Sequence, residues 1–221
     1  MTTGHREINA PLDVPEPIPA CIALNRDKAA KDAVDKEWHK LETCERPDPK
    51  DKGISCWEIS EVREASDVRA AANKPGADGA DFARIAELCY EKGSELAKGD
   101  PERKFKGRAV LLGDNVKDQD FNWAEFQDPS SAPATIEAAK ACDALGCLPG
   151  YMVKSNDAHG AYTQAYLKQE GKRTWLHLPR ERWPKSWIGK YTNPVVPLVL
   201  ALYGHPEAGG HWEAHCTSKL L

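Results

Sequence analysis

Helical spacing of apolar residues first appears after Asn25. One face of this stretch carries Ala30, Val34, Trp38 and Leu41, and Lys and Asp occupy the opposite face. Such a two-sided pattern predicts an amphipathic helix that covers a core. The polar, proline-containing stretch ERPDPKDKG follows and would end the helix.

Three later stretches also predict helices. The first follows Ser60 and turns its apolar residues, from Val62 to Ala72, inward. The others cover 82–92 and about 134–145, and the last of these lies between an SSAP start signal and a glycine stop signal.

A change to strand periodicity comes next. Between 104 and 112, Lys106, Arg108 and Val110 alternate with apolar or small residues, which predicts a strand with two cations on one face. Short apolar runs at 151–157 and 173–178 predict two further strands, the first of them buried.

The order of these elements predicts an α/β (α+β) fold in three parts. Four prolines within residues 1–20 prevent a helix, so we expect 1–25 to be a disordered, Pro-rich tail. A mainly helical N-terminal portion is expected over 26–103, and the strand-bearing remainder over 104–221.

Composition excludes several classes of protein. Of the 221 residues, 41% are apolar, as in globular proteins, and the longest apolar run, 195–203, is too short for a membrane span. No apolar segment follows Met1, so we expect no secretory signal. Seven cysteines without a CxxC pair favour a reducing, intracellular compartment and do not distinguish cytoplasm from nucleus.

Net charge changes sign along the chain. Residues 1–150 hold 21 basic and 29 acidic side chains, whereas residues 151–221 hold 9 basic and 5 acidic. Within 168–190, tryptophans are interleaved with cations, a combination that binds phosphates and stacks on bases. The candidate nucleic-acid-binding residues are Lys168, Lys172, Arg173, Arg180, Arg182 and Lys185. The alternative, which composition alone favours, is a solvated loop whose tryptophans pack on the core.

A histidine-rich segment near residue 221 suggests metal binding. His205, His211, His215 and Cys216 are zinc-ligand types, and HWEAH places two histidines on one helix face. The zinc-protease pattern, however, needs Glu where Trp212 stands, and no CxxC pair supports a structural zinc site. We therefore favour surface histidines over a zinc site.

Asp157 is the carboxylate with the clearest chemical context. It ends the predicted strand 151–157 and precedes small residues that would let a ligand approach the backbone. Opposite a strand that bears Lys106 and Arg108, it could hold a divalent cation near a polyphosphate. The alternative is an ordinary turn residue.

Three further blocks of sequence are KFKGRAVLLGDNV (104–116), NDAHGAYTQAYL (156–167) and LALYGHPEAGGHWEAH (200–215). In this order they resemble the reverse transcriptase domain of Ty1/copia-type retrotransposon polyproteins, most closely a divergent branch found in unicellular algae. The first block is similar to the fingers segment of that family, and the second to the palm strand Asp-Val-Lys-x-Ala-Phe-Leu. The third is similar to Lys-x-Leu-Tyr-Gly-Leu-Lys-Gln-Ala-Pro-Arg-x-Trp. The resemblance covers about 26–216 and implies partial polymerase fingers and palm with a helical N-terminal portion.

The resemblance implies a role for each matching residue. Asp157 and the carbonyl group of Ala158 would bind the two catalytic Mg²⁺ ions of the complete domain. Lys106 and Arg108 would clamp the incoming triphosphate, and the ring of Tyr162 would exclude a ribose 2′-OH. The implied partners are an RNA/DNA template-primer, a dNTP and other parts of the polyprotein, with no membrane.

Two departures from the family limit the expected activity. Glu207 stands where the family has Gln, near the nucleotide sugar, and its carboxylate would repel a triphosphate. The Tyr-x-Asp-Asp hairpin, which supplies the other two metal-binding carboxylates, is absent and is expected beyond Leu221. We therefore expect a fragment of an RNA-directed DNA polymerase that is inactive by itself. The alternatives are a non-catalytic nucleic-acid-binding fragment and a zinc-stabilised interaction domain.

Overall fold

The computed structural model describes residues 18–19, 27–44, 53–126, 134–155, 157–167 and 171–220. These residues form two compact units and have an α+β fold. The first unit combines the described residues up to Glu37 with Glu87–Arg108, and the second combines Trp38–Ala86 with Ala109–Leu221. This division differs from the expected boundary at residue 103 because two long strands extend through both units.

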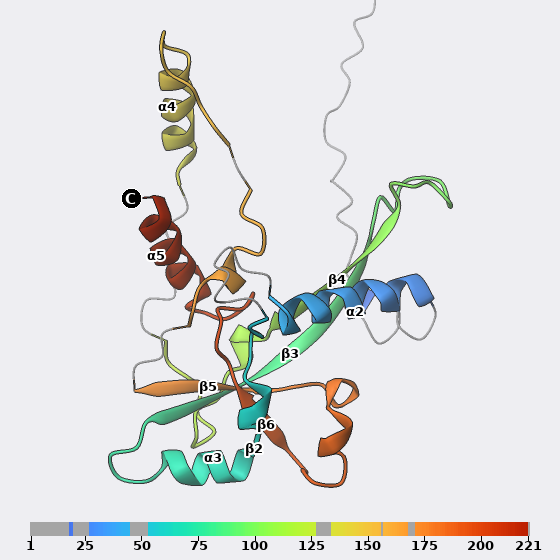
Figure 1. Ribbon diagram of the computed structural model, residues 1–221, viewed down its shortest axis with the longest axis vertical. Coiled ribbons are helices and arrows are strands. Elements are labelled where there is room, and N and C mark those ends of the chain that lie inside the picture. Colours follow the sequence, from blue (N-terminus) through green and yellow to red (C-terminus); the bar gives the residue numbers. More distant parts are fainter. Residues whose placement is uncertain are drawn as a thin grey trace, which may run out of the picture. The chain divides into compact units, whose positions relative to one another are not determined.

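The first unit is a helix packed on paired strands (Figure 1). The helix α2 (Lys28–Glu42) begins where the Asp27 side chain accepts a hydrogen bond from the N–H of Ala29 at 2.8 Å, a typical N-terminal cap. The strands β3 (Gly79–Lys92) and β4 (Lys104–Leu111) pair with each other, and β1 (Ile18–Pro19) pairs antiparallel with β3. The helix predicted after Asn25 and the strand predicted over 104–112 are thus confirmed.

The contact between α2 and β4 depends on Gly107. A Cβ atom at this position would lie 2.6 Å from both the carbonyl oxygen of Ala33 and the Cα of Val34, closer than real side chains approach. The main chain of the helix therefore rests directly on the strand. All four apolar residues of the predicted inner face of α2 are buried, which confirms that face.

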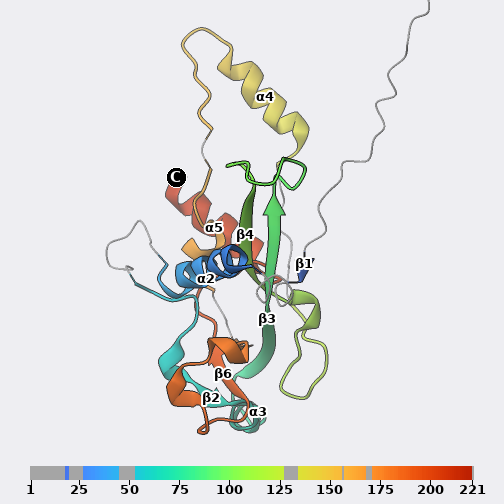
Figure 2. The same ribbon diagram turned by 90° about the vertical axis from the view of Figure 1, so that its right-hand side faces the viewer.

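The second unit is built on a mixed sheet with the strand order β3-β5-β6-β2. β5 (Lys172–His177), the strand predicted at 173–178, runs parallel to the first half of β3. β6 (Pro194–Pro197) runs antiparallel to β5, and β2 (Arg63–Glu64) pairs with β6. The helix α3 (Ala65–Ala72), predicted to follow Ser60, begins only at Ala65 and lies beside β2 (Figure 2). A buried cluster in the core of the second unit joins α3 to the sheet, and its residues are Ala65, Val68, Ala80, Phe82, Trp175 and Val195.

The helix predicted at 82–92 is wrong, because this segment belongs to β3. Phe82, Ile85 and Cys89 are spaced as on one face of a helix, and all three are buried. The residues from Ala80 to Ala83 are, however, buried at every position. A strand that is covered on both faces shows no alternation of polar and apolar residues, so its sequence is easily read as a helix.

The buried strand predicted at 151–157 is also wrong. Its described residues have no regular secondary structure, and the side chains of Tyr151 and Met152 are 67% and 76% exposed. The preceding helix α4 (Ile136–Gly146) matches the helix predicted at 134–145, and the side chain of Thr135 caps it by accepting a hydrogen bond from an N–H of its first turn. The side chains of α4 are exposed as far as Leu145, so apolar composition alone does not bury this part of the chain.

The remaining elements are short or close to the last described residue. The final helix, α5 (Ala208–Leu220), contains HWEAH, as the spacing of its histidines predicts. Within the described parts of the chain, no helix combines the length and the apolar character that crossing a membrane requires. The 3-10 helices among the described residues are η2 (Ile59–Glu61), η3 (Gly113–Asn115), η4 (Tyr162–Gln164), η5 (Arg180–Arg182) and η6 (Lys185–Trp187).

Candidate functional site

The three blocks of sequence named above, 104–116, 156–167 and 200–215, meet at Tyr203 in the second unit. Its carbonyl oxygen accepts a hydrogen bond of 2.8 Å from the N–H of Leu111, at the end of β4. Its ring lies edge-on to the ring of Tyr162, with the centroids 4.8 Å apart. Leu111 belongs to the first block, Tyr162 to the second and Tyr203 to the third, so segments that are distant in the sequence are adjacent in space.

Two glycines permit this close approach. Gly204 has a φ of +89°, and a Cβ atom on it would overlap the carbonyl oxygen of Leu111. A Cβ atom on Gly113 would in turn overlap the carbonyl oxygen of Gly204. Only glycine combines the left-handed backbone with the required space. The close packing of the blocks therefore explains why glycine follows Tyr203 in the third block.

Small side chains hold the second block against the third. Ala165, Ala201 and Ala208 form a buried cluster, and the N–H of Ala201 donates to the carbonyl oxygen of Ala165 at 2.9 Å. Ala208 is the first residue of α5. Because alanine side chains are short, the backbones of the two blocks approach closely enough to form this hydrogen bond.

Asp157 and Ala158 are exposed and lie in an irregular segment before η4, not on a strand. The residues that follow are fixed locally, because the side-chain amide of Gln164 donates to the carbonyl oxygen of His159 at 2.7 Å. The Asp157 carboxylate and the Ala158 carbonyl are oxygen donors of the kind that Mg²⁺ prefers. Among the described residues, however, no three His, Cys, Asp or Glu side chains are grouped to hold a metal ion. This donor set is too small for two Mg²⁺ ions.

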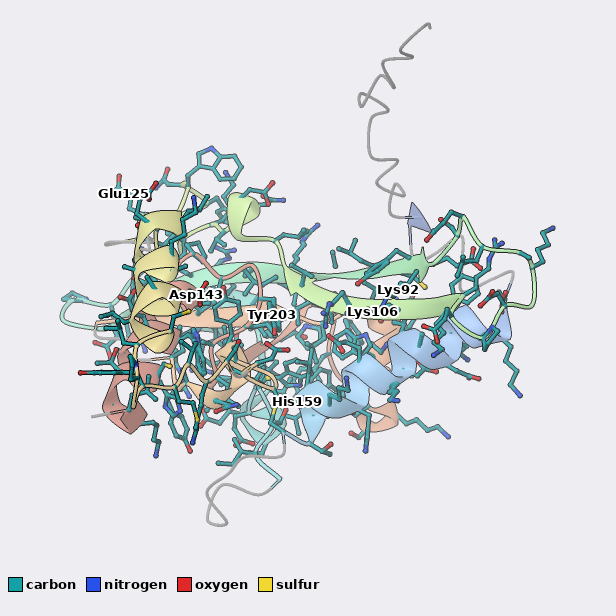
Figure 3. The ribbon with its side chains drawn as sticks, turned by 90° about the horizontal axis from the view of Figure 1, so that it is seen from above. Lys92, Lys106, Glu125, Asp143, His159 and Tyr203 are labelled. Carbon is teal, nitrogen blue, oxygen red and sulfur yellow. The ribbon has the colours of Figure 1, made fainter. Side chains whose placement is uncertain are left out.

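The two cations of the first block lie on β4 in the first unit. Their strand alternates as predicted, with Gly107 and Ala109 buried, Lys106 exposed and Arg108 half-buried. Figure 3 labels Lys106 on this strand. Nη1 of Arg108 lies 3.2 Å from Oε1 of Glu37, a buried carboxylate on α2. Arg108 is therefore ion-paired, and a triphosphate would compete with Glu37 for it.

Glu207 is half-buried, and its backbone is tied to a buried histidine. The N–H of Glu207 donates to Nδ1 of His205 at 3.2 Å, and Nε2 of His205 lies 3.2 Å from Oγ1 of Thr174. Because Nδ1 accepts, Nε2 carries the proton and donates to Thr174. Burial, and to a smaller extent the nearby His211, lowers the pKa of His205 to about 4. His205 is thus a neutral residue of the core, and the described histidines and cysteines form no metal-binding group.

No family model, curated protein or solved structure matches this chain.

Two basic candidates of the 168–190 stretch form ion pairs. Nζ of Lys172 lies 3.0 Å from Oδ1 of the buried Asp81. Nη1 of Arg173 lies 2.9 Å from Oε2 of Glu61, and both of these side chains are partly exposed. Neutralised cations of this kind attract nucleic acid less than unpaired ones do.

The other basic candidates lie near tryptophans or outside the described residues. Arg180 and Arg182 lie over the rings of Trp183 and Trp38, at 5.7 and 5.1 Å from the ring centroids. Trp175 and Trp187, by contrast, are buried, so their rings pack on the core as the alternative interpretation predicts. Lys185 is exposed, and Lys168 lies outside the described residues.

Sequence reasoning misses a cationic pocket in the second unit. The pocket has a volume of about 440 Å³, and its lining includes Arg69, Arg84, Lys117 and His177. These residues come from α3, from β3, from the segment after β4 and from the end of β5. No period or motif links them in the sequence, so only the tertiary structure reveals that they belong together.

Proposed function

We propose that this chain is a fragment of the RNA-directed DNA polymerase (reverse transcriptase) of a Ty1/copia-type retrotransposon. The observation that carries the proposal is the meeting of the three resembling blocks at Tyr203. The resemblance assigns both Tyr162 and Glu207 to the surroundings of one nucleotide sugar, and such shared roles require the second and third blocks to be adjacent. Lys106 and Arg108 belong to the first unit and enter the proposal through the resemblance alone.

This chain contributes binding and positioning rather than complete catalysis. Its matching carboxylate is Asp157, and the Tyr-x-Asp-Asp segment that supplies two more is absent from the sequence. Two-metal nucleotidyl transfer needs carboxylates that hold both ions at once. We therefore assign to Tyr162 the selection of deoxyribose, and we expect nucleotide incorporation only from a chain that carries the further carboxylates.

Primer extension on a primed RNA template tests this proposal. One protein is the 221-residue chain, and the other is the same chain extended by a segment that carries Tyr-x-Asp-Asp. We expect incorporation that requires Mg²⁺ from the extended chain only. Asp157→Asn in the extended chain should slow incorporation about a hundredfold or more, because a metal-binding carboxylate is lost. Asp143→Asn, at an exposed carboxylate on α4, is the matched control and should change nothing (Figure 3).

The possible outcomes distinguish a polymerase fragment from a fragment that only binds nucleic acid. A folded extended chain that incorporates no nucleotide would refute the polymerase proposal. Parental activity in Asp157→Asn would show that the catalytic carboxylate lies elsewhere. Binding of the primed template with a steep salt dependence, without incorporation by the extended chain, would instead support a non-catalytic nucleic-acid-binding fragment.

A further inference from the structure

The pocket around Arg69 contains none of the residues assigned to the polymerase site. Its volume is about 440 Å³, and its polar lining includes the side chains of Asn115 and Asn193 besides those of Arg69, Arg84, Lys117 and His177. The described residues that line it include no Asp or Glu. The lining thus includes three permanent cations and no carboxylate, and the charges of Asp118 and Asp120 act on Arg69 from nearby. The remaining excess of positive charge favours an anion.

The guanidinium group of Arg69 is held in a fixed orientation. It lies between two aromatic rings, 3.8 Å from the centroid of Phe82 and 3.9 Å from that of Phe121. Its Nη1 donates to the carbonyl oxygens of Asp118 and Gln119, at 2.7 and 2.9 Å. A guanidinium has five N–H donors, so these two hydrogen bonds leave further donors that can bind a ligand. Because the group is already ordered, little conformational entropy is lost when it binds one.

The loop that carries Phe121 is held in a strained backbone conformation. Phe121 has a φ of +67°, which residues with a side chain rarely adopt. The carboxylate of Asp118 stabilises the loop by accepting hydrogen bonds from the N–H groups of Asp120 and Asn122, at 2.8 and 2.9 Å. Backbone strain of this kind is often found at binding sites, where it places a particular side chain. Here it places an aromatic ring over Arg69.

Arg84 and Lys117 supply the other positive charges of the pocket lining, whereas His177 is neutral. Arg84 is exposed, and Nζ of Lys117 lies 2.9 Å from the centroid of the Trp123 ring. Burial, followed by the charges of Arg84 and Arg69, lowers the pKa of His177 to about 4. The imidazole is therefore neutral near pH 7 and acts in the pocket as a hydrogen-bonding group.

We propose that this pocket binds a small molecule that carries a phosphate monoester. Two guanidinium groups and an ammonium group match the charge and the several oxygen atoms of a phosphate better than those of a single carboxylate. The pocket is larger than one phosphate group, and the ring of Phe121 is 70% exposed at its wall, so the organic part of the ligand has an apolar surface to contact. This inference does not depend on the polymerase proposal.

Isothermal titration calorimetry of the 221-residue chain tests the proposal, with ribose 5-phosphate as the probe and ribose and inorganic phosphate as comparisons. We expect ribose 5-phosphate to bind more tightly than inorganic phosphate and ribose not to bind. Arg84→Gln and Lys117→Gln should each raise the Kd about tenfold or more, because a charged hydrogen bond to the phosphate is lost. Lys140→Gln, on the exposed helix α4, should leave the Kd unchanged.

The melting temperature of each variant shows whether it is folded, so that lost binding can be interpreted. The proposal would be overturned if the folded parent protein bound none of the phosphate probes, or if Arg84→Gln and Lys117→Gln bound as the parent does. Equal affinity for inorganic phosphate and the ester would support the phosphate site and overturn the organic part of the proposal.

Discussion

Gly204→Ala adds one methyl group at the point where the three resembling blocks meet. Gly204 has a φ of +89°, and its missing Cβ would overlap the carbonyl oxygen of Leu111. That carbonyl belongs to the main chain, so it cannot rotate away as a flexible side chain would. The substitution therefore has to move a backbone segment, and it weakens the hydrogen bond between Leu111 and Tyr203.

The expected loss of stability has two parts. The left-handed backbone costs alanine about 1 kcal/mol more than glycine. Forcing an extra methyl group into a packed position costs typically about 1–3 kcal/mol more. Gly204→Ala should thus lower the free energy of unfolding by about 2–4 kcal/mol, a large share of the roughly 5–15 kcal/mol that keeps a domain folded.

Urea unfolding followed by tryptophan fluorescence measures this loss, and two other glycines provide controls. Gly189 has a φ of +81° with no atom near its missing Cβ, so Gly189→Ala should show the backbone cost alone, about 1 kcal/mol. Gly210 lies in α5 at an ordinary φ and in open space. Gly210→Ala should therefore raise the free energy of unfolding by about 0.5–1 kcal/mol.

The comparison among these three variants tests whether Gly204 packs closely against Leu111. If Gly204→Ala and Gly189→Ala lost the same stability, the close approach of Gly204 to Leu111 would be wrong. If Gly204→Ala lost none, the meeting of the three blocks at Tyr203 would be refuted.

Three other experiments test the core, a helix cap and the nucleotide site. The pKa of His205 is about 4 in the folded chain and about 6.5 when unfolded, so acid protonates the unfolded state first. The contribution of His205 to stability should therefore be full above about pH 6.5 and fall by up to about 3 kcal/mol toward pH 4, and His177 should add a fall in the same range. His205→Gln should remove its own share of this fall in urea unfolding at several pH values. Thr135→Ala should destabilise α4 by about 1 kcal/mol, seen as faster amide exchange in that helix. Tyr162→Ala in the extended chain should increase ribonucleotide incorporation relative to deoxyribonucleotide incorporation, and an unchanged ratio would contradict its proposed role.

The sequence by itself determined the elements whose signals are local. The inner face of α2, the alternation along β4 and the position of α4 each depend on residues within a few positions of one another. Periodicity and capping report such neighbours directly, because they arise from the geometry of one turn or one strand. The order of the three resembling blocks is also a property of the sequence alone.

Tertiary structure decided everything that depends on partners distant in the sequence. β3 is a strand because it pairs with β5, β4 and β1, although Phe82, Ile85 and Cys89 have helical spacing. Segment 151–155 is exposed and has no regular secondary structure, although its sequence predicts a buried strand. The junction at Tyr203 and the pocket around Arg69 likewise unite residues from separate segments. No spacing rule covers such contacts, because the free energy that selects them comes from packing, strand pairing and charge in the folded chain.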